Sequence, residues 1–323
     1  MKVNDAGAVW CGLKRMRRLR SIFTTFTIFT VFTIAVGARA AFAEIPSFDD
    51  VKARWTSTEG MLLDRHGILI HELRVVEHGR RLEWTRLAEI SPAALATIVR
   101  AEDKRFYRHG GVDWLALSDA ALDTLLFSKP RGASTISMQV AAQLDDALRP
   151  GRQKRTMSQK WDQIKAAKEL ESAWSKSQIL EAYLNLSTFR GELQGIAAAS
   201  RGLFGKSPDG LDERESLLLA VLLRGPNSQP PTAVKRACAL AVNMNLDMSC
   251  PQIETLAQAA LSGSPGIAPR ASLAPHVARE LLLAERAREQ TTLDAELQAF
   301  AVEVLQKQQI GRASCRERVC DSV

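Results

Sequence analysis

The sequence predicts a mainly α-helical protein with one short β-hairpin, and two observations support this fold class. Apolar residues recur at helical spacing in long segments, most clearly over residues 92–106 and 211–223. Strand-like sequence is concentrated at residues 57–75, where two apolar triplets flank the turn-rich Asp64-Arg65-His66-Gly67.

Composition narrows the class of partner. The 323 residues are 46% hydrophobic, enough for one large domain or two smaller ones. A net charge of +7 and a pI near 9.3 favour an anionic partner, namely nucleic acid, a membrane surface or a phosphate-bearing substrate. Aromatic residues make up only 6% and no zinc-finger or RNA-binding motif occurs, so nucleic acid is disfavoured. The five cysteines show no metal-binding spacing.

The N-terminal segment predicts export from the cytoplasm. Residues 1–20 are basic, and residues 21–38 carry no charge, a length that crosses a bilayer if Arg39 snorkels. We therefore expect a cytoplasmic tail over 1–20 and a transmembrane signal anchor over 21–43. The alternative is a cleaved signal peptide, because Ala41-Phe42-Ala43 matches a small-residue cleavage site. Both interpretations place the rest of the chain outside the cytoplasm.

A carboxylate interrupts the apolar face of the most distinctive predicted helix. Ser91 is the expected N-cap and Pro92 the first helical residue. One continuous face then carries four apolar residues and one acidic residue: Leu95, Ile98, Val99, Glu102 and Phe106. Partial burial of a carboxylate suits general acid–base catalysis. The alternative is a buried structural pair between Glu102 and either Arg105 or His109.

Two motifs resemble those of a known family. Glu102, Asp103, Phe106, His109 and Gly111 form the pattern Glu-Asp-x-x-Phe-x-x-His-x-Gly. It resembles the first signature of the peptidoglycan glycosyltransferases (family 51), the polymerase module of class A penicillin-binding proteins. Residues 132–139, Gly-Ala-Ser-Thr-Ile-Ser-Met-Gln, resemble the second signature. The resemblance implies a lysozyme-like glycosyltransferase domain with Glu102 as catalytic base, Asp103 as an orienting group, and Phe106 and His109 near the substrate.

The second motif also predicts a helix N-terminus. Ser134 or Thr135 can cap a helix that runs to Gln143. Free N–H groups beside Arg131 would attract an anion, although simple capping explains the same residues. In the resembled family this loop and Gln139 line the cleft that holds a lipid diphosphate.

The most basic stretch precedes another helix. Its cationic residues are Arg149, Arg152, Lys154, Arg155, Lys160, Lys165 and Lys168. Such a run is usually a solvated face, but here Lys160 and Gln163 share one side of the predicted helix. The resemblance makes Arg155 and Lys160 candidates for binding the diphosphate.

Gln163 departs from the family's third signature, which usually reads Arg-Lys-x-x-Glu and supplies a second carboxylate. A glutamine cannot hold or give a proton, but it can hydrogen-bond a diphosphate or a sugar. Asp162 lies about 100° round the helix and is a poor substitute. The penicillin-binding protein 1C branch of the family resembles this chain in having Lys-x-x-Gln. We therefore interpret Gln163 as a subfamily trait that casts doubt on any two-carboxylate mechanism.

A third group of motifs extends the resemblance over residues 57–235. Ser175 and Gln178 form a predicted capping box that starts a helix resembling the fourth signature, Ile-Leu-Glu-x-Tyr-Leu-Asn. Its Glu181 and Asn185 have the spacing of structural polar contacts, and Asn185 is also a candidate for substrate binding. We expect the glycosyltransferase domain to span residues 44–235.

The C-terminal region predicts a helical linker over residues 236–290. Cys238 and Cys250 lie in this exported region, where a disulfide and two free thiols are both open. Residues 291–309 resemble the opening of a penicillin-binding transpeptidase domain. No Ser-x-x-Lys occurs anywhere in the chain, so the acylated serine of such a domain is missing. Residues 310–319 match the translation of a common sequencing adapter, and we expect 310–323 to carry no biology.

These expectations combine into one hypothesis. The resemblance implies a bacterial inner-membrane enzyme with a periplasmic catalytic domain that polymerises lipid II and releases a polyprenyl diphosphate. The developing charge would be met by Lys160, Arg155 and the 134–139 loop, with a divalent cation (Mg²⁺ or Mn²⁺) as an open addition. Partners would be lipid II, the polyprenyl diphosphate-linked glycan, the membrane and other cell-wall synthesis proteins. A lysozyme-like hydrolase and a non-catalytic lipid II-binding scaffold are the alternatives.

Overall fold

The computed structural model describes residues 45–119, 134–145, 148, 157–263 and 266–320, with side chains as far as residue 308. These residues belong to one compact unit that begins at Ile45. The predicted cytoplasmic tail and signal anchor lie outside the described residues. Within the described ranges, no helix combines the length and the apolar character that a membrane span requires.

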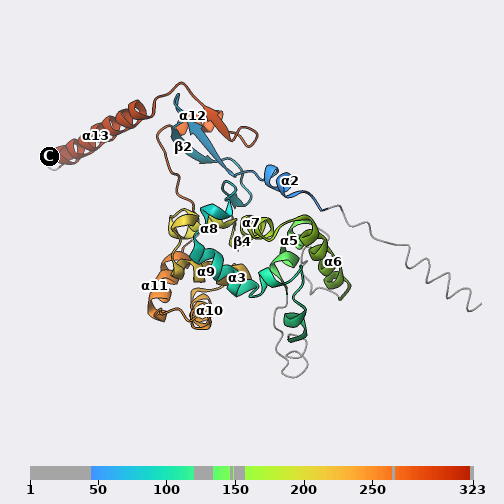
Figure 1. The fold of residues 1–323 in the computed structure, drawn as a ribbon. Coiled ribbons are helices and arrows are strands. Elements are labelled where there is room, and N and C mark those ends of the chain that lie inside the picture. The colour runs from blue at the N-terminus through green and yellow to red at the C-terminus, as the bar shows by residue number, and fades with distance from the viewer. Residues whose placement is uncertain (1–44, 120–133, 146–147, 149–156, 264–265, 321–323) are drawn as a thin grey trace, which may run out of the picture. The chain divides into compact units, whose positions relative to one another are not determined.

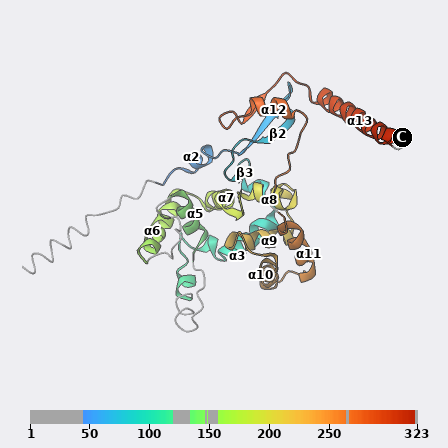
Figure 2. The ribbon, with the colours of Figure 1, turned by 180° about the vertical axis from the view of Figure 1, so that it is seen from behind.

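Helices dominate the described residues, which confirms the predicted mainly α class (Figures 1 and 2). The helices are α2 (Phe48–Ala53), α3 (Pro92–Glu102), α5 (Ile136–Leu144), α6 (Met157–Ala173), α7 (Lys176–Leu186), α8 (Ile196–Phe204), α9 (Glu213–Arg224), α10 (Pro230–Asn243), α11 (Cys250–Leu261), α12 (Pro275–Leu281) and α13 (Ala295–Cys320). The strands are β1 (Glu59–Leu63), β2 (Leu69–Arg74), β3 (Arg80–Arg81), β4 (Thr188–Arg190), β5 (Leu193–Gln194) and β6 (Arg288–Gln290). In the described part of the chain they form two sheets with the orders β2-β1-β6 and β3-β5-β4.

Helix α3 begins where the sequence predicts and ends earlier. It starts at Pro92 after Ser91, although the Ser91 side chain makes no capping hydrogen bond. The predicted continuation to Phe106 is wrong, because the helix ends at Glu102 and Phe106 lies in a separate 3-10 turn, η2 (Phe106–Arg108). The cause is Asp103, whose backbone leaves the helical region (φ −152°, ψ 78°) and whose side chain binds groups outside the helix.

Helices α3 and α9 pack against each other in the main core (Figures 1 and 2). Helix α9 begins with a capping box formed by Asp212 and Glu215 and then buries every residue from Leu217 to Leu222. This packing brings the last residue of α9, Arg224, to the last residue of α3, Glu102. The ends of two buried helices therefore define the position of the candidate base.

Helix α7 fixes the segment that leads into α3. Its Glu181 accepts a hydrogen bond from Trp84 Nε1 at 2.7 Å and another from the Leu87 backbone N–H at 3.0 Å. The amide of Asn185 accepts from the Thr85 N–H and donates to the Thr85 carbonyl, both at 2.9 Å. The two residues thus have the structural role that their spacing predicts.

Two predictions that rest on pairs of residues have clear outcomes. The capping box of Ser175 and Gln178 at the start of α7 is confirmed. Cys238 and Cys250, whose state the sequence leaves open, form a disulfide that joins α10 to α11 with a Cα–Cα distance of 5.7 Å.

The predicted β-hairpin is confirmed as the antiparallel pair β1 and β2. Strand β6, within the segment expected to be a helical linker, pairs in parallel with β1 and extends this sheet. Helix α12 packs on the sheet, and the two enclose a small apolar core of Leu62, Ile70, Ala274, Ala278 and Leu282. A strand of three residues carries almost no periodicity, so the sequence pattern did not reveal β6.

A buried carboxylate ties this sheet to the helices. Glu72 in β2 is 4% exposed and accepts both arms of the Arg201 guanidinium from α8, at 3.2 and 2.8 Å. Arg270 donates its backbone N–H at 2.8 Å and its guanidinium at 2.8 and 3.1 Å. Burial by itself would raise the pKa of Glu72, but the hydrogen bonds from Arg201 and Arg270 outweigh burial and lower that pKa to about 2.

Replacing Glu72 with glutamine should lower the free energy of unfolding by about 3 kcal/mol at neutral pH, because two guanidinium groups lose a buried counter-charge. The pKa of Glu72 is lowered from its ordinary 4.5 to about 2 in the folded protein, so the ionised carboxylate stabilises the fold at pH values above 4.5. This contribution is lost as the pH falls from 4.5 toward 2. The difference between wild type and variant, measured by chemical denaturation, should therefore shrink between pH 5 and pH 3.

The control is Glu192→Gln, because Glu192 is 55% exposed in its ion pair with Arg74. An exposed pair contributes about 0–1 kcal/mol, so this substitution should change stability little. Equal losses from the two substitutions at pH 7 would contradict the assignment of Glu72 as the anchoring carboxylate.

Candidate active site

Glu102 lies at the meeting point of three helices. Its side chain is 6% exposed, Oε2 accepts from Gln139 Nε2 of α5 at 3.0 Å, and Oε1 accepts from Arg224 Nε of α9 at 2.9 Å. The partners suggested by the sequence, Arg105 and His109, bind other carboxylates instead. Glu102 is therefore buried and paired, but with residues that are distant in the sequence.

Tyr183 fixes the orientation of the Gln139 amide. Its hydroxyl donates to Gln139 Oε1 at 3.4 Å, which leaves the amide nitrogen facing Glu102. Tyr183 is 1% exposed, and its burial, together with the nearby charge of Glu102, raises the pKa of the phenol well above its usual value. The phenol is thus a neutral hydrogen-bond donor at neutral pH.

Asp103 joins the first motif to the second. Its carboxylate, 3% exposed, lies 3.0 Å from His109 Nε2 and accepts the backbone N–H of Ile136, the first residue of α5, at 3.1 Å. Thr135 caps the same helix by accepting from the Met138 N–H at 3.2 Å, and it donates to the Gly111 carbonyl at 2.6 Å. The sequence predicted that free N–H groups at the start of α5 would attract an anion. Two of these, the N–H groups of Ile136 and Met138, are hydrogen-bonded to Asp103 and Thr135.

Phe106 and His109 form the inner wall of the loop between the motifs. Phe106 is fully buried, and Lys176 Nζ lies 4.4 Å from the centroid of its ring. The same ammonium donates to the His109 carbonyl at 2.7 Å and to Glu171 at 2.6 Å. Neither Phe106 nor His109 lines the cavity described below. The contacts that the structure shows for them therefore have a structural role in holding the loop.

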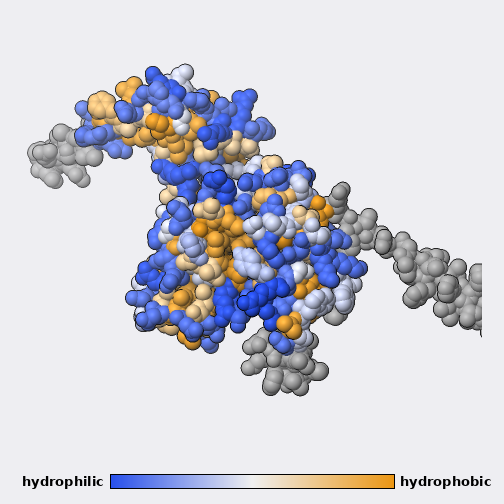
Figure 3. All heavy atoms as spheres, in the orientation of Figure 1, coloured by the Kyte–Doolittle hydropathy of each residue, from blue (hydrophilic) through white to orange (hydrophobic). Residues whose placement is uncertain are grey.

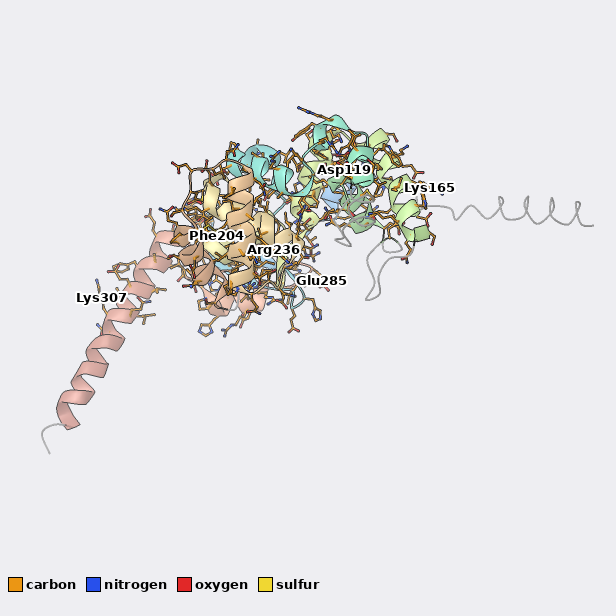
Figure 4. The ribbon with its side chains drawn as sticks, turned by 90° about the horizontal axis from the view of Figure 1, so that it is seen from below. Asp119, Lys165, Phe204, Arg236, Glu285 and Lys307 are labelled. Carbon is orange, nitrogen blue, oxygen red and sulfur yellow. A yellow bond between two sulfur atoms is a disulfide. The ribbon has the colours of Figure 1, made fainter. Side chains whose placement is uncertain are left out.

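A cavity of about 970 Å³ opens beside Glu102. Its basic lining residues are Arg100, Lys104, Arg105 and Arg108, and its acidic lining residues are Glu102, Asp103, Asp113 and Asp119. Figure 4 labels Asp119. Ser134 and Thr135 complete one side, and the Ser134 hydroxyl accepts from Lys160 Nζ at 2.8 Å. The surface in Figure 3 mixes hydrophilic and apolar residues. The cavity thus combines the buried Glu102 carboxylate with arginine and lysine side chains that could meet an anionic ligand, while Asp113 and Asp103 are paired with Arg105 and His109.

Gln163 is a buried link between α6 and α5. It is 1% exposed, and its Nε2 donates to the Met138 carbonyl at 2.7 Å. Its Oε1 is buried and has no hydrogen-bond partner among the described residues. Gln163 does not line the cavity, so the position that carries the second carboxylate in the resembled family is here part of the protein interior.

Other predicted site residues are placed as follows. Arg155 lies outside the described residues. Asn185 is 1% exposed, and its amide is hydrogen-bonded to the backbone of Thr85 and Glu181, so the structure gives it protein partners only. Gln139, expected near the diphosphate, contacts Glu102 directly.

Asp103, His109 and Asp113 lie close enough to hold a metal ion, with one ligand atom from each within 4.8 Å of the others. However, both oxygens of Asp113 accept from the Arg105 guanidinium, at 2.7 and 2.9 Å. Burial opposes the ionisation of Asp113, but Arg105 and the Ala116 N–H outweigh it and lower the pKa of that carboxyl. A divalent cation would have to displace a guanidinium, so these residues do not fit a metal site as they stand.

A family model described as "Transglycosylase" matches residues 66–248, more than half of the chain. The chain belongs to the transglycosylase family. Penicillin-binding protein 1C of Escherichia coli is 35% identical over 227 residues, which are 68% of this chain and 29% of that protein. The biosynthetic peptidoglycan transglycosylase of Mannheimia succiniciproducens is 38% identical over 144 residues, 45% of this chain and 57% of that protein.

Other relatives of this transglycosylase-family chain are also longer than the part they share with it. Penicillin-binding protein 2D of Bacillus subtilis is 35% identical over 161 residues, 50% of this chain but only 23% of that protein. Penicillin-binding protein 1A of Haemophilus influenzae aligns over 75% of this chain and 28% of its own, with 18% identity and a TM-score of 0.32. The family assignment rests on the sequence matches.

Sequence reasoning missed three residues of the candidate site: Arg224, Tyr183 and Lys176. Arg224 and Lys176 contact the first motif from other helices, and Tyr183 contacts Gln139 of the second motif. Tyr183 belongs to the fourth signature, which was a usable signal. Arg224 and Lys176 lie near a helix end with nothing local to distinguish them from solvated cations.

Gly111→Ala should destabilise the fold by about 1–3 kcal/mol, because Gly111 has φ +85° and an added Cβ would lie 2.7 Å from the Ala167 carbonyl oxygen of α6. The neighbouring Gly110 has a normal φ and open space around it, so Gly110→Ala is the matched control. Thermal unfolding of both variants tests this. Equal stability of the two would show that the α6 contact yields without strain.

Gln163→Glu should destabilise the fold by about 2 kcal/mol or more, because the carboxylate cannot donate to the Met138 carbonyl and brings a charge into the interior. Gln252 is an exposed residue of α11, so Gln252→Glu is the control and should be nearly neutral. Denaturant unfolding at pH 7 measures both. A stable Gln163→Glu variant would mean that this pocket accepts the family's second carboxylate.

Proposed function

We propose that this chain is a peptidoglycan glycosyltransferase that polymerises lipid II into β-1,4-linked glycan strands and releases polyprenyl diphosphate. Support comes from the transglycosylase family match and from the relatives named biosynthetic peptidoglycan transglycosylase. The observation that carries the proposal is the carboxylate of Glu102, buried and paired at the edge of a cavity lined by both cations and carboxylates.

In this proposal Glu102 is the general base. The 4-hydroxyl of the acceptor sugar attacks the anomeric carbon of the growing chain, its proton passes to Glu102, and the bond from that carbon to the diphosphate breaks. Attack opposite the leaving group inverts the configuration and gives the β linkage. A carboxylate has about four lone-pair sites, so Glu102 can keep Gln139 and Arg224 and still accept the substrate hydroxyl.

The diphosphate leaves with the bonding electron pair and needs a positive environment. Lys160, held against Ser134, and the cavity residues Arg100, Lys104 and Arg108 are suited to this task. Asp103 would keep the two motifs in register through its contacts with His109 and α5. Asp113 and Arg105 neutralise each other and add little net charge.

The proposal extends to the surroundings of the domain. We propose a lysozyme-like catalytic domain over residues 44–235, anchored by residues 21–43 in the bacterial inner membrane and facing the periplasm. The family match and the basic composition support this placement. Residues 291–309 would open a transpeptidase domain, and lipid II and other cell-wall synthesis proteins would be the partners.

Glu102→Gln should abolish glycan synthesis, lowering the rate by about 100-fold or more, because an amide cannot take the proton. The test is polymerisation of labelled lipid II by the full chain in detergent, with strands resolved by gel electrophoresis. Exposed Glu213→Gln on α9 is the control and should polymerise normally.

The possible outcomes separate the candidate functions. Strands from the wild type and none from Glu102→Gln would support a polymerase with one carboxylate. Lipid II binding without strands from the wild type would instead support the scaffold. Cleavage of preformed glycan by the wild type would support the hydrolase.

A further inference from the structure

Arg224 stands out because it contacts the candidate base from another helix, α9. It is the last residue of α9, and its side chain is 57% exposed although Glu102 is 6% exposed. Its Nε donates to Glu102 Oε1 at 2.9 Å, and another nitrogen of the guanidinium donates to the Ala101 carbonyl. The planar guanidinium therefore spans the carboxylate and the end of the α3 backbone.

The position of Glu102 creates an electrostatic problem that Arg224 offsets. Glu102 is the last residue of α3, where the unpaired carbonyls and the helix dipole are negative and disfavour a carboxylate. Arg224 satisfies one of these carbonyls and supplies a positive charge to the same carboxylate. Among the described residues, it is the cation that forms an ion pair with Glu102.

The other groups that face Glu102 are neutral or belong to other pairs. Gln139 donates from α5, and the phenol of Tyr183 on α7 faces both that amide and Glu102 itself. On α3 and the loop beyond it, Arg100 donates to the Asn243 carbonyl and Asp103 is paired with His109. Gln163, at the position of the second carboxylate in the resembled family, is engaged with the Met138 carbonyl.

We infer that Arg224 is a positioning residue for the proposed transfer reaction, which places a positive charge 2.9 Å from Glu102 Oε1 and orients that carboxylate toward the cavity. The inference rests on the proposed function. In this role the charge of Arg224 acts on the base, and substrate need not touch it. A purely structural role in joining α9 to α3 is the competing explanation, and the two differ in what they do to the pH dependence of the rate.

The experiment compares lipid II polymerisation by the full wild-type chain, Arg224→Gln, Arg224→Lys and a control. Arg214→Gln is matched, because Arg214 is an exposed arginine at the opposite end of α9, where it is paired with Asp212. For each protein, kcat, KM, the pH–rate profile and the melting temperature are measured.

Arg224→Gln should lower kcat by about 10- to 100-fold with little change in KM. The acidic limb of its pH–rate profile should move to higher pH, because a positive charge that favours the carboxylate is gone. Arg224→Lys should restore the acidic limb and part of kcat, since it keeps the charge but not the planar geometry. Arg214→Gln should match the wild type.

Other outcomes overturn the inference. If Arg224→Gln lowers only the melting temperature, the role of Arg224 is structural. If the substitution raises only KM, Arg224 contacts the substrate directly. If Arg224→Lys leaves the acidic limb where Arg224→Gln puts it, the charge does not act on the base. A wild-type chain that makes no glycan defeats the proposed function and this inference together, whereas an active wild type with an unchanged Arg224→Gln profile defeats the inference alone.

Discussion

The site depends on the carboxylate of Asp103. By leaving the helical conformation it ends α3 at Glu102, and by accepting the Ile136 N–H it fixes the start of α5. Its contact with His109 holds the loop between the two motifs. Without these bonds the α3 end and the Gln139 amide would not be fixed relative to each other, and Glu102 would lose one of its two partners. A residue adjacent to the candidate base thus determines the geometry around it.

Local patterns in the sequence predicted the elements that local forces determine. Pro92 at the start of α3, the capping box of Ser175 and Gln178, and the β1–β2 hairpin are all encoded by neighbours in the chain. The end of α3 was missed because Asp103 leaves the helix to bind Ile136, a residue of another helix. Periodicity continued through this point, but tertiary hydrogen bonds prevailed over it.

The site was predictable only in part for the same reason. Glu102 and Gln139 belong to recognisable motifs, but their contact with each other and the pairing of Glu102 with Arg224 depend on how α5 and α9 lie against the end of α3. The buried contact of Gln163 with Met138 likewise depends on the packing of α6 on α5. A helical face identified from spacing shows which residues are neighbours on one helix, but it does not show which helix lies opposite.

The Cys238–Cys250 disulfide has a consequence for how the protein is made. The bond closes a short loop between α10 and α11, and such bonds form and persist in oxidising compartments. A chain retained in a reducing cytosol would keep both thiols free and would lack this link between helices packed beside α9. The thiol content of these two cysteines therefore records whether a given molecule has reached an oxidising compartment, independently of any activity.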